Sequence, residues 1–277
     1  MAGEHRPIVG FVGLGSQGGP MARRIVAAGY TLLLWARRPE SLAPYADTAA
    51  EAVPDLAAMG ARADHVGVCV VDDAGVRAVC GELLPAMRPG SRLVIHSTVH
   101  PDTCTTLAEQ ARARGVALID APVSGGGPGA AAGTLTVMVG GAADDVAAAR
   151  PVFETFGKLI AHLGGVGAGQ YAKLVNNALM AANMASADAA LGAGAALGLD
   201  RAALVALVAA SSGRSFGFDV RARIPDPGGW AHGAALLAKD VRLLGEVLPH
   251  DPAAARLSAT AGPFLHDIID APVGDPE

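Results

Sequence analysis

A glycine-rich run near the start of the chain places the tightest constraint on its fold. Gly13-Leu14-Gly15-Ser16-Gln17-Gly18 directly follows the apolar stretch Ile8–Val12, which predicts a strand, and it precedes a helical stretch. In such a strand–turn–helix the first glycine permits a tight turn. The second lets the backbone approach a pyrophosphate, and the third lets the helix pack closely on the sheet. An ordinary glycine-rich turn is the alternative, but the flanking strand and helix favour a dinucleotide-binding loop.

Short aliphatic runs alternate with helical stretches through the first half of the chain, which predicts βαβ units and a mostly parallel sheet. After about Gly165 the pattern is helical only, starting with one long alanine-rich segment, Gly167–Leu197. We therefore expect an α/β Rossmann domain over residues 1–165, followed by an all-α substrate and dimerisation domain over residues 166–277. The expected strands are Ile8–Val12, Thr31–Trp35, Val66–Val71, Leu93–His96, Val116–Ile119, Leu135–Val139 and Leu159–Leu163, with helices near Pro20–Ala28, Ala74–Leu84 and Thr103–Arg114.

Composition excludes several classes of protein. Hydrophobic residues make up 51% of the 277 residues and charged residues 17%, which is typical of a packed core and not of a disordered chain. The formal net charge is −5 with no long basic run, so nucleic acid is not an expected partner. Polar residues interrupt the alanine-rich stretches, which argues against a membrane span.

Cysteine usage and the start of the chain bear on location. The three cysteines, Cys69, Cys80 and Cys104, are an odd number without metal-ligand spacing, so they indicate reduced packing thiols and no metal site. Residues 1–7 are too polar and too short for a signal peptide. The expected location is the cytoplasm.

The residues at the end of the second expected strand indicate which dinucleotide cofactor the chain prefers. It reads Trp35-Ala36-Arg37-Arg38, and no acidic residue follows until Glu40. NAD enzymes place a carboxylate here for the ribose 2′-hydroxyl, whereas forked guanidinium donors suit a 2′-phosphate. Two solvated arginines are the alternative interpretation. We expect NADP(H), with NAD(H) the less favoured cofactor.

Four further motifs follow in order and make the pattern specific. Together with the glycine loop they resemble the β-hydroxyacid dehydrogenase family, which includes 3-hydroxyisobutyrate dehydrogenases and is related to 6-phosphogluconate dehydrogenases. The resemblance extends from about Ile8 to about Leu265. It implies an NAD(P)-dependent oxidoreductase that transfers a hydride between the nicotinamide and a small β-hydroxy acid or the matching semialdehyde. The motifs are Asp120-Ala121-Pro122-Val123-Ser124-Gly125-Gly126, Gly133–Gly141, Gly167–Asn177 and Lys239-Asp240.

The resemblance also implies a role for individual residues. Lys173 matches the catalytic general acid/base, and Asn177 matches a residue that positions the substrate and that lysine. The implied substrate-binding residues are Ser124, Gly125, Gly126, Asn176 and Lys239. The implied cofactor-binding residues are Gly13, Leu14, Gly15, Ser16, Gln17, Gly18, Arg37, Arg38, Val70, Val71, Thr98 and Lys239.

The chemistry of the lysine motif agrees with this role. Lys173, Asn176 and Asn177 stand at i, i+3 and i+4 of an expected helix, so they share one face. A lysine among Ala, Leu and Val is partly desolvated, which disfavours its charged form and brings its pKa towards working pH. Without the resemblance, Lys173 would be interpreted as a snorkelling surface lysine, and Lys239-Asp240 as a solvated helix pair.

Departures from the family pattern leave the subfamily and the hydroxy acid open. His96 stands where an aspartate is common, Val70-Val71 replaces a common Leu-Pro, and Ala36 replaces a common asparagine.

The alternative functions are an imine reductase, which usually lacks a lysine at position 173, and a non-catalytic NADP-binding scaffold. The alanine-rich helix favours a homodimer or homotetramer. The direction of the reaction and the roles of His96, Phe216, Phe218 and Trp230 stay open.

Overall fold

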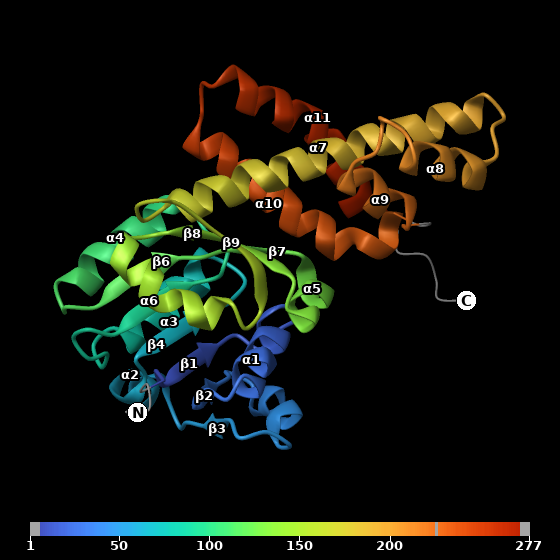
Figure 1. Cartoon of the computed structure of the whole chain (residues 1–277). Helices are drawn as coiled ribbons and strands as arrows, with labels where there is room; N and C mark the ends of the chain where they lie inside the picture. Colours follow the sequence, from blue (N-terminus) through green and yellow to red (C-terminus); the bar gives the residue numbers. More distant parts are fainter. Residues whose placement is uncertain (1–5, 225–226, 272–277) are drawn as a thin grey trace. The chain divides into compact units, whose positions relative to one another are not determined.

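The computed structural model describes residues 6–224 and 227–271, and its chain divides into two compact units, Met1–Lys173 and Leu174–Glu277. The first unit alternates strands and helices as expected (Figure 1). Its elements are β1 (Val9–Val12), α1 (Gly18–Ala27), β2 (Leu32–Trp35), the 3-10 segment η1 (Pro39–Tyr45), β3 (Glu51–Ala52), α2 (Leu56–Arg62), β4 (His65–Val68), α3 (Asp73–Leu83), β5 (Arg92–Ile95), α4 (Pro101–Arg112), β6 (Ala117–Asp120), β7 (Val123–Ser124), α5 (Gly126–Ala132), β8 (Leu135–Gly140), α6 (Ala143–Phe153), β9 (Gly157–Gly164) and the first turns of α7 (Ala168–Ala196).

The strands form one mostly parallel sheet in the order β3-β2-β1-β4-β5-β6-β8-β7, with β9 parallel to β8. Strands β1 to β6 are parallel to their neighbours, whereas β8 runs antiparallel to β6 and β7. The α/β fold class is confirmed. The elements missed from the sequence are mostly short: β3 and β7 have two residues each, too few to show a period, and the glycine- and alanine-rich α5 carries no apolar stripe. Helices α2 and α6 were also missed.

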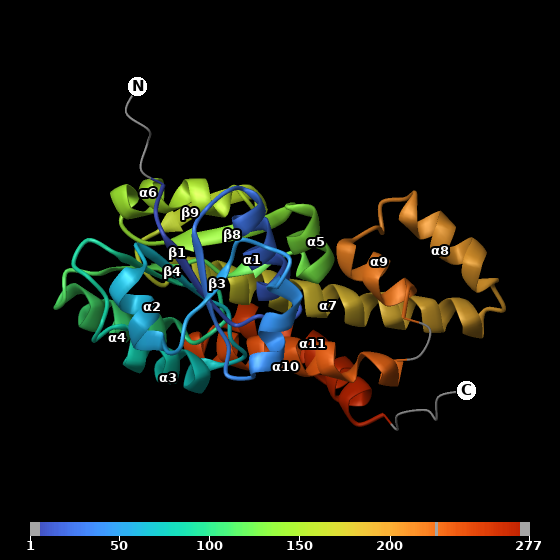
Figure 2. The same cartoon turned by 90° about the horizontal axis from the view of Figure 1, so that it is seen from below.

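Two apolar cores cover the two faces of the sheet. Because side chains alternate along a strand, Phe11 packs with α1 and α6 on one face, while Val12 packs with α2, α3 and α4 on the other. The same division separates Val94 from Leu93 and Ile95 on β5. Figure 2 shows α6 on one side of the sheet and α2 to α4 on the other. The packing of helices on both faces fixes the position of the parallel strands, whose carboxyl ends lie along one edge of the sheet.

The described elements of the second unit are helical. They are the remainder of α7, α8 (Arg201–Ala209), α9 (Phe216–Ala222), the 3-10 segment η2 (Pro227–Trp230), α10 (Ala231–Val247) and α11 (Pro252–Ile269). Its core joins small and aliphatic side chains of α7, α10 and α11, including Ala178, Ala181 and Leu244. Asp200 and Asp251 cap the N-termini of α8 and α11 through their side-chain oxygens. Among the residues described, no helix combines the length and the apolarity needed to cross a bilayer.

Candidate active site

The glycine loop between β1 and α1 has the geometry of a phosphate-binding turn. Gly13 adopts φ +96°, and a Cβ on it would lie 2.0 Å from the carbonyl oxygen of Cys69. A Cβ on Gly18 would lie 2.0 Å from the carbonyl oxygen of Gly13, so a side chain there would push α1 off the sheet. A Cβ on Gly15 would meet no described atom within 4 Å. The loop is therefore closed towards the protein at Gly13 and Gly18 and open towards a ligand at Gly15, which fits a bound pyrophosphate.

Two further strand ends, those of β4 and β5, lie at the same edge of the sheet. Strand β4 pairs with β1 and β5 pairs with β4, all parallel, so the residues that follow them emerge beside the glycine loop. Val71 is 71% exposed, and the Val70 amide donates to Ser97 Oγ at 2.8 Å. Thr98, directly after Ser97, is half-buried. The edge that carries Val70, Val71 and Thr98 is where open α/β sheets bind ligands.

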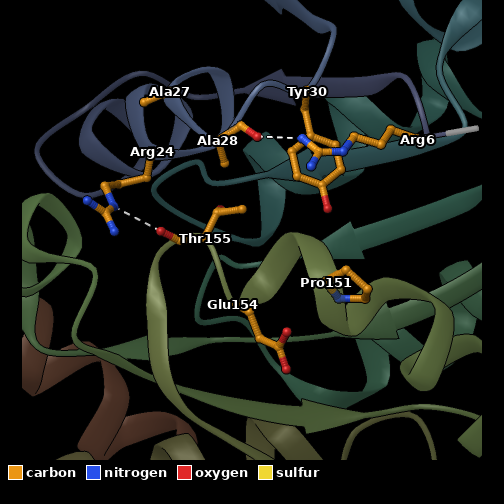
Figure 3. A pocket seen from close by; sticks show the side chains of 8 residues that line it. All are labelled: Arg6, Arg24, Ala27, Ala28, Tyr30, Pro151, Glu154 and Thr155. Atoms are coloured by element: carbon orange, nitrogen blue, oxygen red, sulfur yellow. Dashed lines mark hydrogen bonds between the residues drawn. The ribbon is translucent and has the colours of Figure 1, made fainter. Parts of the chain in front are cut away.

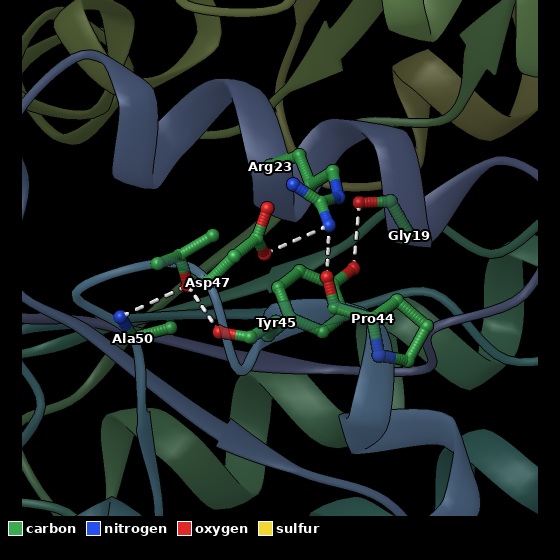
Figure 4. Close-up of polar contacts among 7 residues, drawn as sticks. Gly19, Arg23, Pro44, Tyr45, Asp47 and Ala50 are labelled. Carbon is green, nitrogen blue, oxygen red and sulfur yellow. Dashed lines mark hydrogen bonds and ion pairs between the residues drawn. The ribbon is translucent and has the colours of Figure 1, made fainter.

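The arginines after β2 are exposed on the same edge. Arg38 Nε lies 3.8 Å from Glu40 Oε1, and both side chains of this ion pair are exposed. The neighbouring residue Arg37 is also exposed. The following segment η1 is tied to α1, as Figure 4 shows: the Tyr45 hydroxyl donates to the Gly19 carbonyl at 2.7 Å, and Arg23 donates to the Pro44 carbonyl and pairs with Asp47. Burial raises the pKa of Tyr45 to about 12.

The turn Ser124-Gly125-Gly126, which we call the substrate turn after its predicted role, joins β7 to α5. Gly125 has φ +130° and Gly126 has φ +64°, conformations that residues with a Cβ rarely adopt. A Cβ on the next residue, Gly127, would lie 2.7 Å from the carbonyl oxygen of Ser16. The substrate turn and the glycine loop are therefore in contact. The exposed amide edge of such a turn is suited to an anion.

Lys173 reaches this turn from α7. Its side chain is only 8% exposed, and Nζ donates to the main-chain oxygen of Val123 at 2.8 Å. Val123 directly precedes Ser124, so the amine lies at the start of the substrate turn. Lys173 is not the solvated surface lysine that its sequence context alone would have suggested.

Asp120 and Gln170 hold the first turn of α7 in place, and sequence reasoning assigned neither a role. Both side chains are fully buried. Asp120 accepts from the amides of Gly167 at 2.7 Å and Gln170 at 2.8 Å. Burial raises the pKa of Asp120 to about 6, although these backbone hydrogen bonds oppose the shift. The signal in the sequence was an acidic residue ending an otherwise apolar strand.

The second unit contributes a separate polar cluster. Asn177 Nδ2 donates to Asp240 Oδ2 at 2.6 Å, and Lys239 Nζ lies 3.1 Å from Asp240 Oδ1. Asn177 and Asp240 are buried, whereas Asn176 is exposed and donates to Asn177 Oδ1 at 3.0 Å. Interpreting Lys239-Asp240 as a solvated pair would be wrong, because the Asp240 carboxylate is enclosed. Asp240 is a third residue, after Asp120 and Gln170, to which sequence reasoning gave no role.

His96 belongs to the core. Its ring stacks on Phe11 at 5.9 Å and meets the edges of Phe153 and Phe156. Nδ1 lies 2.8 Å from the Ala121 carbonyl oxygen, and because a carbonyl only accepts, Nδ1 carries the proton. Burial lowers the pKa of His96 to about 4, so the ring is neutral at neutral pH. Of the three aromatics whose roles the sequence left open, Phe218 is buried, Trp230 packs against the helical core and Phe216 is exposed.

A surface pocket of about 420 Å³ lies elsewhere in the first unit (Figure 3). It is bordered by the carboxyl end of α1 and the turn after α6, at the amino edge of the parallel strands. Both arginines that line it are hydrogen-bonded to main-chain carbonyls: Arg6 donates to Ala28 and Arg24 donates to Thr155.

The described residues hold no cluster of three metal-ligating side chains, and Cys69, Cys80 and Cys104 are free thiols.

Comparison with known families covers both units. A family model described as the NAD binding domain of 6-phosphogluconate dehydrogenase matches residues 8–164. A second model, described as the NAD-binding of NADP-dependent 3-hydroxyisobutyrate dehydrogenase, matches residues 167–270.

Individual proteins agree with the family models. The chain is 36% identical over 277 residues to an NAD-dependent L-serine dehydrogenase of Pseudomonas aeruginosa, covering 92% of this chain and 88% of that protein. It is 34% identical over 249 residues to human mitochondrial 3-hydroxyisobutyrate dehydrogenase, covering 85% and 74%. The solved structure of a Mycobacterium tuberculosis 3-hydroxyisobutyrate dehydrogenase with L-serine matches with a TM-score of 0.83 at 28% identity, covering 96% of each chain.

Proposed function

The chain belongs to the β-hydroxyacid dehydrogenase family, and from this premise we propose that it is an NADP-dependent enzyme in which Lys173 is the general acid/base. An NAD(P)-dependent dehydrogenase acting on a hydroxyl group of a small hydroxy acid is the activity that its named relatives share. The observation that carries the lysine proposal is the 2.8 Å hydrogen bond from Lys173 Nζ to Val123 at the start of the substrate turn.

The residues of the first unit supply binding and proton transfer in this proposal. The Ser124 hydroxyl and the turn amides hold the substrate carboxylate, because an anion is stabilised by converging N–H and O–H donors. In oxidation the neutral Lys173 amine takes the proton from the substrate hydroxyl, and in reduction the ammonium returns it. A nicotinamide cofactor held by the glycine loop, Val70, Val71 and Thr98 would supply the hydride acceptor for oxidation and the hydride donor for reduction.

Asn177, one turn beyond Lys173 on α7, is proposed to orient the substrate and the lysine. Asp240 accepts from the Asn177 amide and so fixes which way that amide faces. Lys239, paired with the same carboxylate, is proposed to add positive charge for the substrate or the cofactor phosphates, and Asn176 to contact the substrate.

NADP is the proposed cofactor because of Arg37 and Arg38. Both guanidinium groups are exposed beyond the end of β2, and the nearest acidic side chain in the chain, Glu40, pairs with Arg38. The relatives differ in this respect: one is named NAD-dependent and one family model is described as NADP-dependent. Measured dissociation constants for both cofactors decide between them.

We also propose a closed homo-oligomer in the cytoplasm. Apolar side chains at the end of α7 and on α8 are exposed in the single chain, with Leu197 77% and Leu207 63% exposed. Such side chains are typical of a surface that pairs with a second copy. The three free cysteines are consistent with a reducing compartment.

A substrate screen tests the function. Purified protein is assayed with NADP+ against small β-hydroxy acids, including 3-hydroxyisobutyrate and L-serine, and with NADPH against the matching semialdehydes and cyclic imines. We expect oxidation of at least one hydroxy acid with formation of NADPH. Turnover of cyclic imines alone would identify an imine reductase, and binding of NADPH without any turnover would identify a scaffold.

A further inference from the structure

Gln170 occupies an unusual position for a polar side chain. It is fully buried on the first turn of α7, and its two amide ends reach a segment more than 70 residues earlier in the chain. Nε2 donates to the Ser97 carbonyl at 2.9 Å, and Oε1 accepts from the Val99 amide at 3.1 Å. The side chain thus bridges the residues on either side of Thr98.

This bridge is part of a longer hydrogen-bonded chain. Ser97 Oγ accepts from the Val70 amide at 2.8 Å, which joins the loop after β4 to the loop after β5. On the other side, the main-chain amide of Gln170 donates to Asp120 Oδ2 at 2.8 Å, which joins α7 to the end of β6. Three adjacent strand ends and the first turn of α7 are therefore linked through the side chains of Ser97, Gln170 and Asp120.

Close packing leaves this turn little freedom. A Cβ on Gly169 would lie 2.3 Å from the Met138 carbonyl oxygen, and a Cβ on Gly140 would lie 2.4 Å from Asp120 Oδ1. Lys173 stands three residues after Gln170, on the neighbouring position of the same helical face. Any rotation or slide of the turn would move the lysine side chain relative to Val123.

We propose that Gln170 is a positioning residue, which couples the strand-end loops at Val70 and Thr98 to the helix that carries Lys173. The proposal rests on the proposed role of Lys173 as general acid/base. Gln170 has both a donor and an acceptor on one planar amide, so it holds both the Ser97 carbonyl and the Val99 amide, which an apolar residue of equal size could not do. A fully satisfied buried network of this kind specifies one geometry. The distance between the expected nicotinamide edge and the amine is set by this bridge.

The test compares Gln170→Met with the matched control Thr103→Val. Thr103 is also fully buried in the first unit, and its hydroxyl donates to Asp73 at 2.5 Å and accepts from Arg77 at 2.8 Å, away from the substrate turn. Both variants lose buried hydrogen bonds, so both should lower the melting temperature. Only Gln170→Met should lower kcat, by about ten- to a hundredfold, since small misplacements of a catalytic group have effects of this size. The dissociation constant of NADPH should change by less than about threefold, because the glycine loop is intact.

A second measurement does not depend on turnover. The labelling rate of Lys173 with an amine-reactive reagent, quantified by peptide mass spectrometry, should rise several-fold in Gln170→Met and stay at the parent value in Thr103→Val. If Gln170→Met does not fold, Gln170→Glu serves instead, because it keeps the length and the acceptor for Val99 but loses the donor to Ser97. Unchanged labelling or unchanged kcat in the Gln170 variant overturns the proposal. If the parent protein oxidises no hydroxy acid, the proposed function fails, and labelling alone then decides whether Gln170 fixes the amine.

Discussion

The amine of Lys173 donates a 2.8 Å hydrogen bond to the main-chain oxygen of Val123, the residue before the substrate turn. A main-chain acceptor cannot be removed by substitution of Val123, and it carries no charge. This hydrogen bond holds the amine at the start of the turn, where we propose that it takes the proton from the substrate and returns it.

Replacing Lys173 with alanine should lower turnover of the best hydroxy acid by about two to four orders of magnitude, the usual contribution of a positioned proton donor. NADPH binding should stay close to the parent value, and the pH profile of oxidation should lose its basic limb. Steady-state kinetics and fluorescence titration with NADPH measure the two effects. The control is Lys158→Ala, since Lys158 is exposed on β9. Near-normal turnover by Lys173→Ala would show that the mechanism is wrong even though the fold is right.

Exchange of Arg37 for aspartate should narrow or reverse the preference for NADPH over NADH. A hydrogen bond to a charged group contributes roughly 1.5–3 kcal/mol, so the affinity for NADPH should fall by one to two orders of magnitude. Arg114→Asp, an exposed arginine between α4 and β6 at the opposite edge of the sheet, should leave both affinities unchanged. Equal or tighter binding of NADH by the parent protein would overturn the assignment of NADP.

Asn177 and Asp240 should behave as one functional unit. Their side chains are joined by a 2.6 Å hydrogen bond, so removal of either partner leaves the other without it. We expect Asn177→Ala and Asp240→Ala each to lower kcat/KM by about tenfold or more, and the double variant to lose less than the product of the two. A double-mutant cycle measures the coupling. Strict additivity would mean that Asp240 does not act through Asn177.

Because its histidines His65 and His96 are buried, the first unit should have a lower free energy of unfolding at acidic pH than at neutral pH. Burial lowers the pKa of His65 to about 3 and that of His96 to about 4, from an ordinary value of 6.5. Below pH 6.5 the unfolded chain binds protons that the native state excludes, so the free energy of unfolding decreases as the pH falls towards 4. Each histidine contributes a slope of up to about 1.4 kcal/mol per pH unit in this window.

Urea unfolding between pH 7 and pH 5 measures this slope. It should be shallower in His65→Phe than in the parent protein, whereas His250→Phe, at an exposed position, should retain the parent slope. A slope that does not change in His65→Phe would contradict the assignment of a buried neutral imidazole.

Leu207, the exposed leucine of α8, should be needed for assembly. We expect a dimer or tetramer by light scattering, and Leu207→Glu should shift it towards monomer because a charge would then have to be desolvated at the subunit contact. Leu159→Glu changes a leucine of similar exposure on β9 and should leave the mass unchanged. A monomeric parent protein at working concentration would contradict the proposed assembly.

Local sequence was sufficient for much of this protein. The strand–glycine–helix pattern of residues 8–28, the arginines after the second strand and the spacing of Lys173 and Asn177 depend on neighbours within a few positions, where backbone geometry follows from residue type. The strands and helices that were predicted lie within a few residues of the observed ones for the same reason, and their alternation determined the fold class. The two-residue strands β3 and β7 could not be predicted, since they are defined only by their pairing with β2 and β8.

Tertiary structure alone decided which polar groups meet within each unit, around the first turn of α7 in the first unit and between α7 and α10 in the second. Asp120 lies 50 positions before Gln170 in the chain, Ser97 lies 73 before it, and Asp240 lies 63 after Asn177. No local pattern links residues at such separations. Asp120, Ser97 and Gln170 meet because the parallel strands end at one edge of the sheet and α7 packs its first turn against that edge, whereas Asn177 and Asp240 meet where α7 packs on α10. The sequence determined the chemistry available, whereas the burial that made Asp120, Gln170 and Asp240 necessary partners arose only when the helices and strands packed together.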